Sequence, residues 1–334
     1  MNGKNRVWIR CTLLVVVIVL IPLLGACAPK PKTYQVGILC GSDAFLEVVA
    51  GFKAGMANLG YVEGENVIYD MQALNADPTG EQHAAERFVS NKVDLIFAVP
   101  TEPAVAAQAA TRETGIPVVF AYAGIENSGL VNSVREPGGN ITGVRFPGPE
   151  QISKRLEILL ELAPQVRRVW IGYDRNYPNT SPALEALRPL AASRGVTLVE
   201  VPATTLEELE ADLASRAAKE DIGIDAIILM PDIFNHSPDG WALIRGFAAQ
   251  HRVPVAGSFL YTVEQGAVFG NANDLVRVGE LAAPLADKIL KGAPAGTIPV
   301  VTPDQALYIN YKVAQQLGLT VSEGLLGQAD EVIR

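Results

Sequence analysis

Side chains that bind small charged molecules follow the strand-like apolar runs of this sequence. They are hydroxyls just before helices, carboxylates and amides directly after strands, and aromatic rings at the same positions. The candidates are Ser42, Asp43, Thr101, Glu102 and Tyr122 in the first half, and Tyr173, Asp174, Asn176, Asp232, Asn235, Ser258, Phe259 and Asn273 in the second. Ligands of open α/β sheets bind beyond the carboxyl ends of the strands, so this distribution predicts a binding site rather than a catalytic one.

The polar candidates each have a ligand role and a structural alternative. Ser42 and Thr101 precede helices, so their hydroxyls and the backbone N–H groups that follow could receive a carboxylate; the alternative is a plain helix cap. Asp232 directly follows the apolar run 227–231, where its carboxylate could pair with an ammonium group. The alternative for Asp232 is a solvated turn aspartate.

The aromatic candidates Tyr122, Tyr173 and Phe259 could stack on an apolar or aromatic part of a ligand, and packing in the core or at the rim is the alternative. Asn273 follows the apolar residues 268–270 and could also reach the site. Its neighbour Asp274 could instead cap a helix over 275–291.

Residues for common catalytic chemistry are missing from the sequence. There is no G-x-S-x-G elbow, Walker A run, H-E-x-x-H or C-x-x-C motif, and the three histidines lack metal-ligand spacing. We therefore predict neither an enzyme nor a cofactor. Cys40 lies inside an apolar run, which indicates a buried strand residue without a disulfide partner.

Strand-like and helix-like segments alternate along the chain and place these candidates in loops. The first series predicts strands over 36–40, 67–73, 93–99 and 116–121 and helices over 44–59, 80–91 and 104–113. This alternation is typical of a doubly wound parallel sheet, and we expect a first lobe over 34–144. Its last stretch, 129–144, predicts strand, turn and strand around Glu136-Pro137-Gly138-Gly139-Asn140.

A second series of the same kind predicts a second lobe over 145–270. Its strands are expected over 168–173, 197–201, 226–230 and 253–256, with helices over 149–162, 182–193, 206–218 and 239–250. Residues 271–334 are expected to cross between or pack on the lobes, with a helix over 275–291, an extended stretch over 297–301 and a terminal helix from about Tyr308. Two such lobes joined by a hinge would close on a small solute.

The amino terminus has the features of an export signal. Three basic residues precede an apolar run over 13–24, which is shorter than the ~20 residues of a membrane-spanning helix. Leu24-Gly25-Ala26-Cys27 looks like a bacterial lipobox, so we expect a signal peptide over 1–26, lipid on Cys27 and a tether over 27–33. The predicted location is the outer face of the cell membrane, and a spanning helix is the alternative.

The charge of the remaining chain limits its partners. Cleavage before Cys27 leaves 24 Lys and Arg against 36 Asp and Glu, a net charge of −12. Such an acidic surface argues against nucleic acid as a partner. The 49% hydrophobic and 19% charged fractions are those of folded globular protein, and the 334 residues suit two domains of ~150 residues.

Blocks spread over nearly the whole mature chain resemble a known family. They are GLVNSVREPGGNITGV at 129–144, RETGIPVVF at 112–120, Lys154-Arg155-Leu156-Glu157, the stretches 59–67 and 92–94, and YINYKVAQQLGLTVSEGLLGQADEVIR at 308–334. The chain is identified by them as similar to the ABC-transporter substrate-binding lipoproteins of the tryptophan/tyrosine type. The resemblance implies a type I periplasmic-binding fold, an ABC permease and ATPase as partners, and uptake of a small solute. We predict that the protein is a monomer.

The resemblance also bears on the ligand. Aromatic amino acids are the family's best-known ligands, and the family shows an acidic residue at the position of Asp232. After the strand over 116–121 the family often has Asp-Pro-Val where this chain has Gly124-Ile125-Glu126-Asn127, so its ligand can differ. The alternative function is a solute-binding sensor that signals to a membrane receptor; neighbouring permease and ATPase genes would favour transport, and a neighbouring receptor gene would favour sensing.

Overall fold

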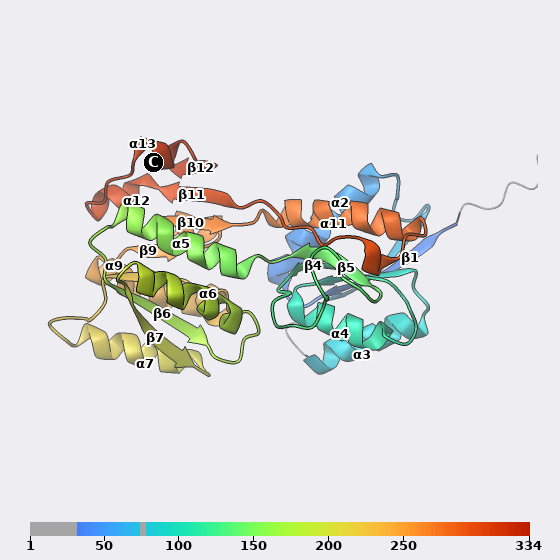
Figure 1. Cartoon of the computed structure of the whole chain (residues 1–334), viewed down its shortest axis with the longest axis horizontal. Coiled ribbons are helices and arrows are strands. Elements are labelled where there is room, and N and C mark those ends of the chain that lie inside the picture. The colour runs from blue at the N-terminus through green and yellow to red at the C-terminus, as the bar shows by residue number, and fades with distance from the viewer. Residues whose placement is uncertain (1–31, 74–77) are drawn as a thin grey trace, which may run out of the picture.

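Two α/β lobes lie side by side in the chain (Figure 1). The structure is a computed structural model and describes residues 32–73 and 78–334. The predicted export signal and Cys27 lie outside the described residues. The predicted fold class, two doubly wound lobes of the type I periplasmic-binding kind, is confirmed: one sheet has five strands and the other seven.

The sheet of the first lobe is wholly parallel, with the order β2-β1-β3-β4-β5. Its described elements are β1 (Tyr34–Cys40), η1 (Asp43–Phe45), α2 (Leu46–Asn58), β2 (Val67–Ala73), α3 (Pro78–Ser90), β3 (Leu95–Val99), α4 (Thr101–Thr111), β4 (Val118–Ala123) and β5 (Ile141–Arg145). Helices cover both faces, so β3 and β4 are buried at every residue, as their continuous apolar runs predict. Cys40 is buried in β1 as a free thiol, as predicted.

The sheet of the second lobe has the order β12-β11-β10-β9-β8-β6-β7. Its elements are α5 (Gly148–Leu162), β6 (Arg168–Asp174), α6 (Thr180–Ser193), β7 (Thr197–Ala203), α7 (Leu206–Ala217), β8 (Ala226–Ile228), α8 (Ile233–His236), α9 (Pro238–His251), β9 (Val255–Gly257), α10 (Leu260–Glu264), β10 (Phe269–Ala272), β11 (Ala306–Asn310), α12 (Tyr311–Gln316), α13 (Glu323–Leu326) and β12 (Glu331–Ile333). Only the pairing of β10 with β11 is antiparallel among the described strands.

Two local expectations are wrong. The terminal helix does not begin near Tyr308: Tyr308 lies in β11, because Leu307 and Ile309 alternate into the core, and the helix starts at Tyr311 after Asn310 caps it. The stretch 129–144 holds one strand rather than two. Its first part is an irregular loop, in which Ser133 Oγ accepts a hydrogen bond from Glu136 N at 2.9 Å.

The chain crosses between the lobes three times. After β5 it enters α5 of the second lobe; after β10 it returns as α11 (Leu275–Leu290), which packs on α2; after Val301 it crosses again to reach β11. Figure 1 shows the orange α11 beside the blue α2. On the first-lobe side the outer two crossings are paired, since Arg145 N donates to Val301 O and Val301 N to Gly143 O, both at 2.9 Å.

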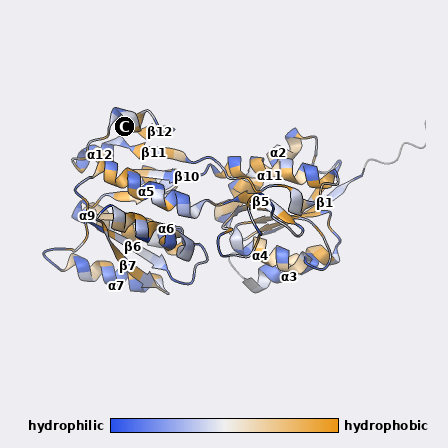
Figure 2. Ribbon diagram, in the orientation of Figure 1, coloured by the Kyte–Doolittle hydropathy of each residue, from blue (hydrophilic) through white to orange (hydrophobic). Residues whose placement is uncertain are grey.

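Buried apolar side chains cover both faces of each sheet. In the first lobe one cluster lies between the sheet and the pair α2 and α11, and another lies under α3 and α4. In the second lobe one lies under α5 and α6, and the other under α7 and α9. Figure 2 shows the hydrophobic colour concentrated on the strands and the inward sides of the helices.

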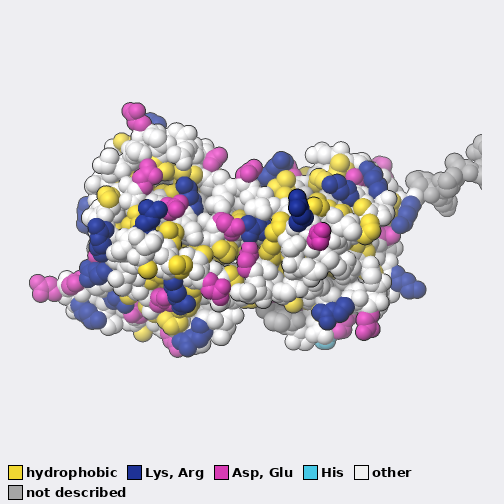
Figure 3. Space-filling view, viewed as in Figure 1, with side chains coloured by type: hydrophobic (Ala, Val, Ile, Leu, Met, Phe, Trp, Pro, Cys, Tyr) yellow, Lys and Arg dark blue, Asp and Glu magenta, His cyan; other side chains and the backbone are white. Residues whose placement is uncertain are grey.

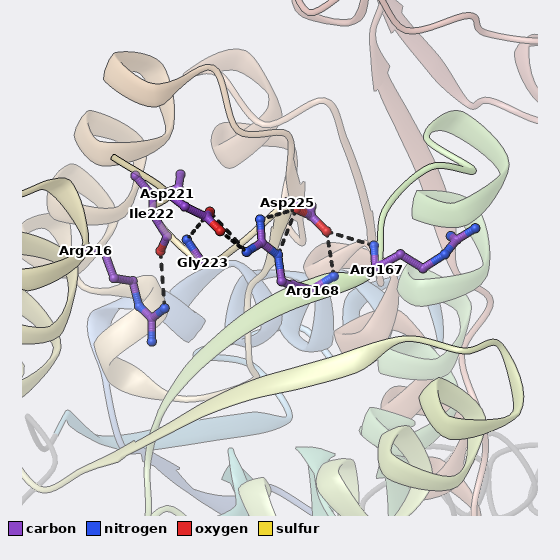
Figure 4. Close-up of polar contacts among 7 residues, drawn as sticks. All are labelled: Arg167, Arg168, Arg216, Asp221, Ile222, Gly223 and Asp225. Carbon is purple, nitrogen blue, oxygen red and sulfur yellow. Dashed lines mark hydrogen bonds and ion pairs between the residues drawn. The ribbon is translucent and has the colours of Figure 1, made fainter. Parts of the chain in front are cut away.

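The amino-terminal end of β6 is held by ion pairs (Figure 4). Asp225 accepts from the backbone N–H groups of Arg167 and Arg168 at 3.0 and 2.8 Å, and its carboxylate also pairs with the Arg168 guanidinium at 2.9 Å. Asp221 pairs with the same guanidinium at 2.8 Å. Because this cluster lies at the opposite end of the sheet from the ligand-binding edge, we assign it to folding.

The close approach of α2 and α11 generates a stability prediction. A Cβ atom on Gly279 would collide with the backbone of Val48 and Phe52. Gly279→Ala should therefore lower the free energy of unfolding by about 2 to 3 kcal/mol, measured by urea denaturation. Gly246 of α9 is the matched control, because a Cβ there meets nothing within 4 Å and Gly246→Ala should stabilise by up to about 1 kcal/mol. Equal stability of Gly279→Ala and the wild type would contradict the close packing.

Candidate functional site

The carboxyl ends of the two sheets face each other, and aromatic rings meet between them. The ring centroid of Tyr122, at the end of β4, lies 6.4 Å from that of Phe259, which follows β9. Tyr122 has a left-handed backbone (φ 53°), which is uncommon for a bulky residue and marks a functional candidate. These two predicted candidates are therefore brought together from different lobes.

Six rings form what we call the aromatic cluster. Phe45 and Phe146 lie 5.7 and 4.9 Å from Tyr122, while His236 and Tyr261 lie 5.3 and 6.0 Å from Phe259, between ring centroids. Its members are Phe45, Tyr122 and Phe146 of the first lobe and His236, Phe259 and Tyr261 of the second. Such a surface suits an apolar or aromatic group.

Asp232 is a buried carboxylate, so the alternative of a solvated turn residue is wrong. It is 2% exposed and caps α8, accepting from Asn235 N at 3.0 Å, from Asn235 Nδ2 at 2.8 Å and from Asp174 N at 3.3 Å. Burial raises the pKa of Asp232 to about 7, against the effect of these hydrogen bonds. The group can therefore change its charge near neutral pH.

Asn235 lies beside Asp232 and has an unused acceptor. Its Nδ2 donates to Gly172 O at 2.9 Å as well as to Asp232, and its side chain is fully buried. The Oδ1 atom has no hydrogen-bond partner among the described residues. Buried polar atoms usually have partners, so this oxygen is a candidate acceptor for a ligand.

Tyr177 interacts electrostatically with carboxylates of both lobes, and the sequence prediction missed it. Burial raises the pKa of its hydroxyl, and the charges of Glu102 of the first lobe and Asp232 of the second raise it further. Burial also raises the pKa of Glu102. Tyr177 lies one residue beyond Asn176, in the same loop after β6, so only a longer search of that loop would have found it.

A cavity of about 610 Å³ opens at this acidic edge of the site. Thr101 and Glu102 from the first lobe and Pro178 from the second line it, together with side chains of α3 and α4. Figure 3 shows the outline of the molecule narrowing between the lobes, with acidic and basic side chains interspersed over the visible face.

The predicted hydroxyl residues are engaged in local structure. Ser42 Oγ accepts from Ala44 N at 3.3 Å and caps the three-residue η1, where Asp43 is exposed. The buried Thr101 Oγ1 accepts from Gly124 N at 2.9 Å and so fixes the loop after β4. Each hydroxyl keeps its proton for donation.

Other predicted residues lie at varying distances from the rings. Ser258 Oγ is 3.3 Å from His236 Nε2, beside the aromatic cluster. Burial lowers the pKa of His236 to about 3, so its ring is neutral at physiological pH. Tyr173 points away, because its hydroxyl donates to Glu200 on β7 at 2.9 Å. Asp174 uses Oδ1 to accept from the backbone of the exposed Asn176.

Asn273 belongs to a set that we call the crossing network, made of the buried Gln151, Arg155, Asn271 and Asn273 and the exposed Gln305. Gln151 Nε2 donates to Asn273 Oδ1 at 2.6 Å, and Asn273 Nδ2 donates to Asp304 O at 2.7 Å. Asn271 Nδ2 donates to Gln151 O and to Gln305 Oε1, both at 3.1 Å. The network thus connects the second-lobe ends of all three crossings.

No three His, Cys, Asp or Glu side chains gather as metal ligands in the described part of the chain. Among the described residues, no helix combines the length and the apolar character needed to cross a bilayer.

Comparison with known proteins identifies close relatives. A family model described as ABC transporter substrate binding protein matches residues 35–333. A tyrosine-binding protein of Clostridioides difficile (strain R20291) is 30% identical over 277 residues, covering 83% of this chain and 77% of the relative.

Two solved structures share the fold. The ABC domain from Streptococcus pneumonia in complex with L-Trp has a TM-score of 0.77 at 24% identity, covering 90% of this chain and 100% of that one. A ligand-free, open substrate binding protein with adhesive properties from Clostridium difficile has a TM-score of 0.69 at 26% identity, covering 90% and 99%.

The buried Asp232 predicts an unusual pH dependence of stability. Its pKa of about 7 in the folded chain exceeds the ~3.9 of an unfolded aspartate, so the folded state holds a proton that the unfolded state releases. The contribution of Asp232 to the free energy of unfolding should thus fall as pH rises from 4 to 7. Between pH 4 and 7 the free energy of unfolding of Asp232→Asn should rise by about 4 kcal/mol relative to that of wild type, measured by chemical denaturation.

The matched control for this experiment is Asp274→Asn, which changes the exposed cap of α11. The difference in the free energy of unfolding between Asp274→Asn and wild type should stay nearly constant over the same pH window. A constant difference for Asp232→Asn as well would show that Asp232 stays ionised when folded.

Proposed function

Because the chain belongs to the ABC transporter substrate-binding protein family, we propose that its two lobes close on an aromatic amino acid and present it to an ABC permease. The tyrosine-binding relative and the L-Trp complex support this ligand class. Family membership makes this chain a solute-binding protein rather than an enzyme. The permease and its ATPase are the partners that the family implies.

The single observation that carries the proposal is the meeting of Tyr122 and Phe259 rings from opposite lobes at 6.4 Å. An aromatic side chain packed against both of these rings touches both lobes only in the closed form. Binding energy then favours closure, because the ligand interacts differently with the open and closed states.

The acidic edge of the site suits the ammonium group of such a ligand. Asp232 and Glu102 come from different lobes and both act on Tyr177. A ligand ammonium beside Asp232 would form a charge-assisted hydrogen bond in a site with little water. Since the carboxylate must be ionised to do this, affinity should rise as pH increases through 7.

Titration calorimetry tests the ligand class. The chain from residue 28 onward should bind L-tyrosine or L-tryptophan more tightly than leucine. Asp232→Asn should weaken that binding about 30-fold, roughly 2 kcal/mol. It should also abolish the rise in affinity between pH 6 and 8.

Asp239→Asn is the control, because Asp239 is exposed at the start of α9 in the same lobe and carries the same charge. It should leave affinity unchanged. If no amino acid binds, the ligand class is wrong; if Asp232→Asn binds like wild type, the ammonium is held elsewhere.

We also propose a lipid anchor on Cys27, supported by Leu24-Gly25-Ala26-Cys27 and the basic and apolar segments before it. Two acyl chains on this cysteine would hold the folded lobes at the membrane surface. Cys27→Ser should release the protein from the membrane fraction and remove incorporation of labelled palmitate, both followed by immunoblot and fluorography. Continued membrane association of Cys27→Ser without label would indicate a retained spanning segment instead.

A further inference from the structure

Arg155 is a buried cation without an anionic partner in the described chain. It is 2% exposed, and its hydrogen bonds to described residues all go to neutral acceptors: Nε to Asn271 Oδ1 at 2.9 Å, Nη1 to Leu229 O at 2.8 Å and Nη2 to Asn271 O at 3.1 Å. No described carboxylate lies within ion-pair distance of it, whereas Arg145 and Arg168 each pair with two. A buried charge left unpaired is costly, so its retention needs a reason.

The guanidinium lies at the ligand-binding edge of the second lobe. Leu229 follows β8 directly and Asn271 lies in β10, so both contacts are near the carboxyl ends of strands. Burial raises the pKa of Tyr122 and lowers that of His236, and the charge of Arg155 lowers both, so this charge reaches the aromatic cluster. Nη1 and Nη2 of Arg155 each have a second hydrogen, which the bonds to Leu229 and Asn271 do not use.

Charge is therefore distributed unevenly along the site. The carboxylates of Asp232 and Glu102 act on Tyr177 at one end, whereas Arg155 acts on Tyr122 and His236 at the other. Tyr122 interacts electrostatically with both Tyr177 and Arg155. A zwitterion with its ammonium group at the acidic end would direct its carboxylate toward Arg155.

We propose that Arg155 is the counter-ion for the carboxylate of the ligand, and that it makes the site select amino acids over amines with the same side chain. This rests on the proposed function, since it assigns the second charge of an amino acid bound there. The start of α4 is the rival receptor for the carboxylate, but Glu102 occupies its first turn.

The experiment compares two ligands that differ only in the carboxylate, L-tryptophan and tryptamine. Dissociation constants are measured by calorimetry, by competition for the weaker ligand, on the chain from residue 28 onward. Wild type should prefer tryptophan at least 100-fold. In Arg155→Met the affinity for tryptophan should fall at least 30-fold and that for tryptamine less than threefold, so the preference should fall at least tenfold.

Arg155→Lys covers the case in which the Met variant does not fold. It keeps the charge but not the planar fork of donors, so the preference should fall at least fivefold. Arg245→Gln, an exposed position in α9, is the control for loss of one positive charge and should leave the preference unchanged.

The outcomes separate the two proposals. A preference within threefold of wild type in whichever Arg155 variant folds overturns the role of Arg155, even where both affinities fall, because a structural role would weaken both ligands equally. Failure of the wild type to bind tryptophan or any other amino acid overturns the proposed function and the role of Arg155 with it.

Discussion

The crossing network is the constraint on which the relation between the lobes depends. Asn271, Asn273 and Gln151 are almost fully buried, so their amides need partners. Their nitrogens donate to one another or to the backbone of Gln151, Pro303 and Asp304, whereas Gln151 Oε1 has no partner among the described residues. The second-lobe ends of the three crossings are thereby fixed as one unit. On the first-lobe side, β5 is paired with Val301. We expect the bending of a hinge to fall on the short stretches between these anchors, 146–147 and 302.

The same constraint links the hinge to the ligand site. Arg155 bonds to Asn271 in the crossing network and acts on Tyr122 and His236 in the aromatic cluster. A ligand that neutralises this charge therefore changes the electrostatic environment of a residue that holds the crossings together. Coupling between binding and domain movement needs such an element, whose energy depends on both.

The sequence could predict the lobes and much of the site for one physical reason. Strands covered on both faces must be apolar throughout, so their ends are visible in the sequence. Tyr122 lies at the end of β4, and Asp232 and Phe259 lie in the loops that follow β8 and β9. The direction of a side chain is less visible: Tyr173 ends a correctly predicted strand but points to Glu200 on β7. Arg155 could not be found, because its partner Asn271 is 116 residues away and the helix pattern of α5 carries no sign of it. Likewise, β11 forms a strand because it pairs with β10, although the local sequence favours a helix there.

The placement of opposite charges at two ends of a buried site has a consequence for closure. When the lobes meet without a ligand, Arg155 at one end of the site and Asp232 with Glu102 at the other end lose water and gain no oppositely charged partner. This loss disfavours the closed state. A proton on Asp232 relieves part of that cost, in line with its pKa of about 7. A zwitterion supplies a partner to both ends at once, whereas a ligand with one charge leaves the other end unpaired. Selectivity then comes from the cost of an incomplete match as much as from the contacts that are made.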